Sequence, residues 1–95
     1  MTMNISICGI EHEIIECEDT FGTDTHMGEI EYGKCLIRIN KNISTQLKKA
    51  TLCHEILHGM LLHIGRDDLS QDEQFVTALG NAISHTFNVK GDFYV

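Results

Sequence analysis

The segment STQLKKATLCHEILHGMLLHIG, residues 44–65, decides the fold because a helical pattern and a metal-binding spacing coincide in it. Ser44 and Asn42 are both plausible N-caps, and Gly65 suits the left-handed backbone that often follows a helix. The apolar positions wrap most of the way round a helical wheel; they are Leu47, Ala50, Thr51, Ile56, Leu57, Met60, Leu61 and Ile64. We therefore expect a central, largely buried helix.

Within this helix, residues 54–58 read H-E-x-x-H. Positions four apart lie on one helical face, so the imidazoles of His54 and His58 can bind one metal ion. Glu55 leaves the same turn and can reach a water molecule on that metal. Without a metal, burying these polar groups in an apolar helix without partners would cost several kcal/mol. The spacing therefore predicts a zinc site with His54 and His58 as ligands and Glu55 as general base.

A third ligand is expected because zinc hydrolases usually have three protein ligands and keep one position for water. Glu73 is our first choice, since it follows His58 by fifteen residues and begins the next predicted helix. Glu73 can instead close a capping box with Ser70. Asp72 and His63 stay open as alternatives, although His63 lies about 140° round the helix from His58.

Strands are expected before the central helix. Residues 5–7 alternate, Gly9 offers a tight bend, and residues 10–15 predict a second strand. Residues 18–29 are polar and predict a loop, whereas residues 30–40 are rich in strand formers, with 36–39 as the best part. We expect the strand that ends near Ile39 to offer an edge on which an extended substrate can pair.

A second helix is expected to open at residues 69–73, with Ser70 and Glu73 as a capping box of the S-x-x-E type. One face of it is apolar (Phe75, Val76, Leu79, Ala82, Ile83 and Phe87), and residues 88–95 form a frayed end or a last short strand. Strands followed by two helices predict an α+β fold, in which a small antiparallel or mixed sheet packs on the central helix.

For several other side chains we expect the burial or exposure that is usual for their residue type. Cys53 is expected to be a small buried core residue. His12, His26 and His85 have no spacing that links them to the metal site, so we expect them at the surface. A donor to the oxyanion of a transition state could come from Tyr32, Tyr94 or His85, and the sequence does not choose among them.

Length and charge limit the function classes. The 95 residues predict one domain, residues 1–95, and the net charge of −7 argues against binding to nucleic acid or to an anionic membrane surface. The N-terminus has no signal-peptide pattern and no apolar run is long enough to span a bilayer, so a cytoplasmic protein is expected. Its four cysteines, Cys8, Cys17, Cys35 and Cys53, are therefore expected as free thiols.

Residues 51–59, TLCHEILHG, resemble the T-L-x-H-E-I-x-H-[AG] signature of short metallopeptidase-like proteins of phages and prophages, which are similar to the ImmA/IrrE group of gluzincin-like zinc metallopeptidases. The similarity extends upstream to residues 5–9, 28–30 and 35–40. Downstream, residues 69–73 and 76–83 look like the second helix of that family. The resemblance thus covers most of the chain, and the zinc motif is its specific part.

The resemblance implies a minimal zincin-like domain with zinc ligands at His54 and His58, a general base at Glu55, and a third ligand at the start of the second helix, which favours Glu73. It also implies a zinc-dependent peptidase that acts on a peptide or protein in the cytoplasm, that of the host cell if the chain is phage-encoded. An alternative from a different class is a zinc-stabilised protein-binding module without proteolytic activity. The oligomeric state stays open.

Overall fold

The computed structural model describes residues 2–18 and 27–87, and within them the chain has an α+β fold. Four strands form one mixed sheet in the order β1-β2-β4-β3; they are β1 (Thr2–Ile7), β2 (Ile10–Cys17), β3 (Gly28–Glu31) and β4 (Leu36–Asn40). The β2–β4 pair is parallel, and the other two pairs are antiparallel. The prediction of a small antiparallel or mixed sheet is therefore confirmed, and the sheet is mixed.

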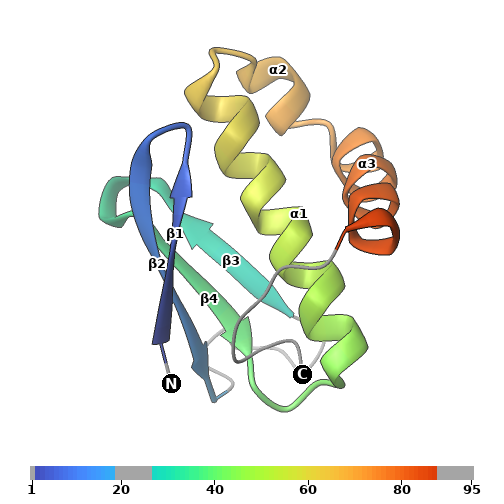
Figure 1. Cartoon of the computed structure of the whole chain (residues 1–95). Helices are drawn as coiled ribbons and strands as arrows, with labels where there is room; N and C mark the ends of the chain where they lie inside the picture. Colours follow the sequence, from blue (N-terminus) through green and yellow to red (C-terminus); the bar gives the residue numbers. More distant parts are fainter. Residues whose placement is uncertain (1, 19–26, 88–95) are drawn as a thin grey trace.

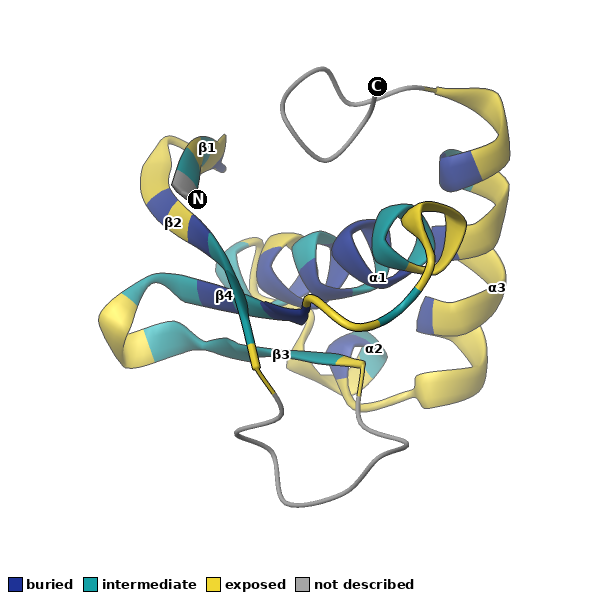
Figure 2. Ribbon diagram, turned by 90° about the horizontal axis from the view of Figure 1, so that it is seen from below, coloured by how far each residue is buried: buried dark blue, intermediate teal, exposed yellow. Residues whose placement is uncertain are grey.

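One face of the sheet carries the long helix α1 (Thr45–His63), and α1 in turn separates the sheet from α3 (Glu73–Thr86). The short helix α2 (Asp67–Ser70) connects α1 and α3 at the top of the view in Figure 1. The helix that carries the H-E-x-x-H motif is thus the central layer of the molecule, in contact with strands on one side and helices on the other (Figure 2).

The ends of α1 follow from local sequence, as predicted. The Ser44 side chain accepts a hydrogen bond from the Leu47 backbone N–H, and this contact caps the helix N-terminus. Past the other end, Gly65 has φ +85°, a conformation that a residue without Cβ adopts freely. The observed helix α1 therefore begins and ends within one or two residues of the predicted helix.

The strand-rich segment 30–40 contains two strands rather than one. A single 3-10 turn, Tyr32–Lys34, reverses the chain between β3 and β4, and Cys35 then takes a left-handed conformation with φ 50°. Strand-forming residues lie on both sides of this turn, so the composition of the segment did not indicate a break between two strands. The expected loop 18–29 is also wrong in part, since Gly28 and Glu29 belong to β3, while residues 19–26 lie outside the described residues.

The second long helix begins later than the capping-box pattern predicts. Asp72, not Ser70, is the N-cap of α3, and its Oδ1 accepts a hydrogen bond from the Phe75 N–H at 3.1 Å. Ser70 instead ends α2, the short turn of helix that the sequence did not predict. Both residues carry side chains that favour helix N-caps, so the choice between them depends on tertiary contacts. The expected tail element at 88–95 lies outside the described residues.

The apolar side chains of the described residues form two clusters on opposite sides of α1. Between the sheet and α1 lie the buried residues Ile7, Ile14, Ile37, Ile39 and Leu52. Between α1 and the α2–α3 segment lie Leu57, Leu61 and Val76, with Leu69 packed against them. The sheet side therefore contains the larger core.

His12 is fully buried, which contradicts the expected surface position. It alternates with Ile14 on the face of β2 that points at α1, so the pleat of the strand places it inside. Cys53 is buried and His85 is exposed, as predicted, whereas His26 lies outside the described residues.

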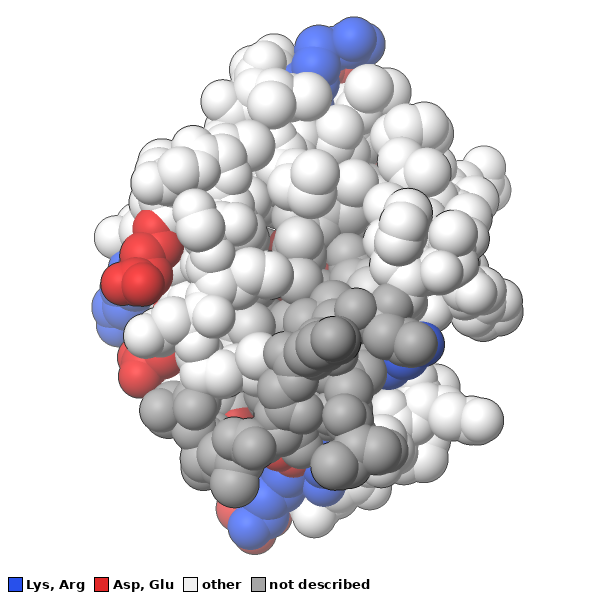
Figure 3. Space-filling model, viewed as in Figure 1, with Lys and Arg blue, Asp and Glu red and all other residues white. Residues whose placement is uncertain are grey.

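Charged side chains do not gather into a basic patch on the face shown in Figure 3, where Lys and Arg of the described residues lie apart around the margin. The four cysteines form no disulfide with one another, as predicted. In the described parts of the chain, no helix has the length and apolar character needed to cross a membrane.

Candidate metal centre

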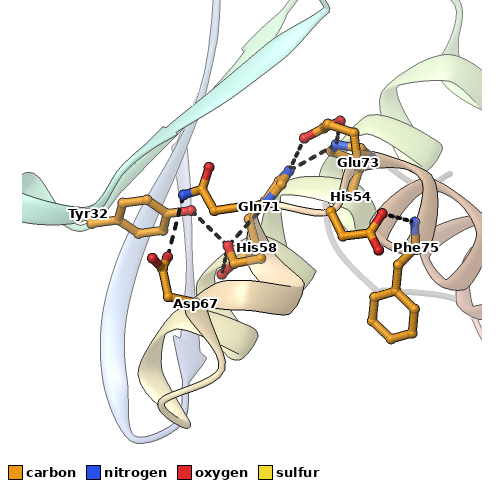
Figure 4. Close-up of polar contacts among 9 residues, drawn as sticks. Tyr32, His54, His58, Asp67, Gln71, Glu73 and Phe75 are labelled. Atoms are coloured by element: carbon orange, nitrogen blue, oxygen red, sulfur yellow. Dashed lines mark hydrogen bonds and ion pairs between the residues drawn. The ribbon is translucent and has the colours of Figure 1, made fainter.

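Two helices bring together the three predicted ligands. His54 and His58 lie one turn apart on α1, and Glu73 is the first residue of α3. The Nε2 atoms of the two histidines are 3.1 Å apart. The Glu73 carboxylate spans both, with Oε1 at 2.8 Å from His58 Nε2 and Oε2 at 3.1 Å from His54 Nε2 (Figure 4). Within residues 2–18 and 27–87, this is the group of His, Cys, Asp or Glu that could hold a metal ion.

The donor atoms suit a small dication. Ligands at about 2.0–2.1 Å from a tetrahedral zinc ion lie roughly 3.3 Å apart, close to the separations among these three groups. Two imidazole nitrogens and one carboxylate are also a ligand set of catalytic zinc sites that keep a fourth position open. Two-thirds of the Glu73 side chain is exposed, so the centre opens toward solvent on the α3 side.

Burial and charge around the histidines also favour a metal. Partial burial lowers the pKa of His54, and the neighbouring His58 adds to this effect, while Glu73 opposes it. A lowered pKa keeps the imidazole neutral, and the neutral ring is the form that ligates. The Nε2 atoms of His54 and His58 thus face the same point as Glu73, in an environment that disfavours a charged imidazole at His54.

Glu55 lies one residue from His54 and is 9 % exposed. Its burial raises the pKa of the carboxyl group to about 7, and the negative charges of Glu73 and Glu29 contribute further. A carboxylate with a pKa near neutrality can both accept and return a proton under physiological conditions. A bound dication would favour the ionised form of Glu55, which is the form that a general base needs.

An open cleft of about 710 Å³ contains the three ligands and Glu55. Its walls come from β3 and the turn after it, from α1, and from the α2–α3 segment. The beginning of β3 lies close to α1. A Cβ on Gly28 would lie 2.6 Å from Thr51 Cγ2 and 2.9 Å from the Arg38 carbonyl oxygen, so a larger residue would not fit there. Gly28 thus lets β3 form one wall of the cleft directly against α1.

The strand beside the cleft is β3, which corrects the expectation for the strand ending at Ile39. That strand, β4, lies inside the sheet between β2 and β3. Because the Asn40 N–H donates to the Met27 carbonyl, the alternation of an antiparallel pair turns the backbone groups of Gly28 and Ile30 away from β4. Both residues line the cleft, so its wall carries backbone donors and acceptors at the sheet edge.

The alternative ligands are occupied elsewhere. Asp72 caps α3 through its side chain. His63 ends α1, and its ring packs edge-on against that of His12 with centroids 5.6 Å apart. Of the candidate oxyanion donors, Tyr32 lines the cleft, His85 lies exposed in the last turn of α3, and Tyr94 lies outside the described residues.

Ser70 is the residue of this candidate site that sequence reasoning missed. Its hydroxyl lies 3.3 Å from His58 Nδ1 and donates to the His58 carbonyl oxygen at 3.2 Å, and the Tyr32 hydroxyl lies 3.5 Å from it. Its capping-box spacing with Glu73 suggested a helix cap, and that interpretation concealed its position beside His58.

Comparisons of this chain with protein-family models, with curated proteins and with solved structures gave no match.

Proposed function

We propose that this protein is a zinc-dependent metallopeptidase with a minimal zincin-like domain of the gluzincin type. The observation that carries the proposal is the convergence of His54, His58 and Glu73 within an open cleft that also contains Glu55. The H-E-x-x-H spacing and the resemblance of residues 51–59 to the ImmA/IrrE group support the same reading.

In this proposal His54, His58 and Glu73 would hold zinc, and the ion would supply Lewis-acid chemistry at the substrate carbonyl and at a water molecule. Glu55 removes a proton from the attacking water and then delivers it to the leaving amine. Its buried position and raised pKa fit both transfers. Two imidazoles and one carboxylate would leave one coordination position for water, as in hydrolytic zinc sites.

The substrate is an extended peptide or protein segment. The outward backbone groups of Gly28 and Ile30 offer hydrogen bonds to a strand laid along β3, and such pairing holds a peptide bond in place without demanding one sequence. An extended segment on this edge runs past Glu55 and the three ligands, since all of them line the same cleft.

The test compares three variants of the full chain after reconstitution with zinc. We expect the wild type to cleave members of a mixed peptide pool, Glu55→Gln to keep one zinc ion and lose cleavage by at least about 100-fold, and His54→Ala to lose the metal. Glu11→Gln, an exposed glutamate on β2, is the matched control and should behave like the wild type.

A wild type that binds no stoichiometric zinc would contradict the proposal. One observation favours a second candidate. Among the residues that the structure describes, a small apolar cluster packs α3 on α1, so a metal between these helices would also stabilise the fold. Stoichiometric zinc without cleavage of any peptide or protein tested would favour this candidate, a zinc-stabilised protein-binding module.

A further inference from the structure

Ser70 lies behind the metal centre, on the side of His58 that faces away from the other ligands. It is the last residue of α2 and is 2 % exposed. Its hydroxyl contacts three polar groups, namely the His58 carbonyl oxygen, His58 Nδ1 and the Tyr32 hydroxyl. Because Ser70 sits twelve positions from His58, a single side chain connects α2 to both the backbone and the ring of one ligand.

The protons of this cluster can be assigned by counting donors. A serine hydroxyl has one hydrogen, and a carbonyl oxygen can only accept. Ser70 therefore donates to the His58 carbonyl and accepts from the other two groups. His58 must then carry its proton on Nδ1, and Tyr32 must donate its hydroxyl proton to Ser70. This assignment satisfies the three contacts of Ser70. The 2.8 Å contact between His58 Nε2 and Glu73 Oε1 then has no proton, because a carboxylate only accepts, and a metal ion between the two atoms would bind both.

The consequence appears at the opposite nitrogen of the ring. With the proton on Nδ1, neutral His58 has a free lone pair on Nε2, which is the atom that lies 3.1 Å from His54 Nε2 and 2.8 Å from Glu73. An imidazole with its proton on Nε2 could not ligate through that atom. The hydrogen bond made by one ring nitrogen thus decides whether the other is available to a metal.

We propose that Ser70 is a positioning residue that fixes the Nδ1–H tautomer and the ring orientation of His58, with Tyr32 as the outer member of the same chain of hydrogen bonds. This inference deepens the proposed function and rests on it for the identity of the metal. It also gives α2 a role, because the turn of helix between α1 and α3 delivers the serine hydroxyl to the ligand.

The test uses Ser70→Ala, with Ser84→Ala as the matched control. Ser84 is also buried on a helix that packs against α1, but its hydroxyl hydrogen-bonds the Cys53 thiol rather than an imidazole. Nitrogen-15 NMR of the zinc-free full chain reports the tautomer of His58 when it is recorded in a Glu73→Ala background, which removes the carboxylate that faces Nε2. Competition with a chelator reports zinc affinity in the chain that keeps Glu73. In the Glu73→Ala background we expect Nδ1–H with Ser70 and with Ser84→Ala, and a shift toward Nε2–H with Ser70→Ala. We also expect a zinc affinity about 10–100-fold weaker in Ser70→Ala.

A His58 proton on Nε2 in zinc-free Glu73→Ala would overturn the inference, even if Ser70→Ala fails to fold. So would a folded Ser70→Ala with wild-type tautomer and zinc affinity. Ser70→Thr keeps the hydroxyl, and wild-type tautomer and affinity in that variant support positioning rather than packing. If the wild type binds no zinc, the proposed function fails, and the tautomer measurement still decides the role of Ser70.

Discussion

The two sides of α1 differ in how they are held. On the sheet side, Leu52 of α1 packs among four buried isoleucines from β1, β2 and β4. On the α3 side, the buried cluster of the described residues contains Leu57, Leu61 and Val76, and the polar side chains of His54 and His58 lie beside it. Apolar burial fixes α1 on the sheet, whereas a metal ligated from both α1 and α3 can strengthen the weaker contact.

The sheet side should lose the most stability when its core is truncated. Leu52 is fully buried between α1 and the sheet, so Leu52→Ala leaves a cavity in the larger cluster. We expect the free energy of unfolding to fall by about 4 kcal/mol, measured by urea denaturation. An effect under about 1 kcal/mol would mean that the sheet side is not the main core.

Glu55 lies at the boundary between the two sides and should make the zinc-free protein sensitive to pH. Burial raises the pKa of its carboxyl group from an ordinary value of 4.5 to about 7, so the folded state binds the proton more tightly than the unfolded state. Stability from this group is therefore present at low pH and is lost as pH rises from 4.5 to 7. The loss amounts to about 3 kcal/mol.

Urea unfolding of the wild type and Glu55→Gln between about pH 4 and 8, with a chelator present, measures this loss as the difference between the two proteins. Parallel pH profiles would show that Glu55 titrates normally in the folded state. The comparison of variants removes the contribution of every group other than Glu55.

Zinc should act mainly on the α3 side. In the zinc-free protein we expect amides of α3 to exchange with solvent faster than those of α1 and β4, because α3 can open without disrupting the sheet. Zinc at about 100 times its dissociation constant adds about 2.7 kcal/mol and should close this gap. Hydrogen exchange with and without zinc measures this difference in exchange rate between α3 and α1. Equal exchange rates of α1 and α3 in the zinc-free protein would contradict the view that α3 is held more weakly than the sheet.

The smallest changes in stability are expected at two glycines that lie on opposite sides of α1. A Cβ at Gly28 would meet Thr51 Cγ2 at 2.6 Å, whereas a Cβ at Gly80 would lie 3.5 Å from His54 Cα. Gly28→Ala should therefore destabilise the fold by about 2 kcal/mol. Gly80→Ala should change it by less than about 1 kcal/mol, or stabilise it, because alanine favours helix. Thermal unfolding of both variants checks this order, and a reversed order would contradict the close packing of β3 on α1.

Local physics made α1 predictable from sequence. The serine cap and the terminal glycine can be recognised without knowledge of distant residues. The i, i+4 spacing of His54 and His58 then places both side chains on one face of the helix. The α+β class followed from the order of elements along the chain. Glu73 could be expected beside these histidines because a short connection brings the next helix back.

The remaining features depend on tertiary contacts. Ser70 and Asp72 both favour helix N-caps, and Ser70 is instead engaged by His58 from another helix. His12 is buried because the pleat of β2 turns it toward α1, which a histidine alone does not indicate. The turn at Tyr32–Lys34 lies in a run of strand formers that offers no break in pattern.

The proposed function requires one metal ion between His54, His58 and Glu73, and X-ray absorption at the zinc edge tests for this ion most directly. In the reconstituted full chain we predict one zinc ion with two imidazole nitrogens and oxygen donors at about 2.0–2.1 Å, and no sulfur ligand. Glu73→Ala should lose the carboxylate oxygen from this shell while Glu55→Gln keeps it. A zinc shell that contains sulfur at about 2.3 Å, or a protein that retains no zinc, would contradict the account.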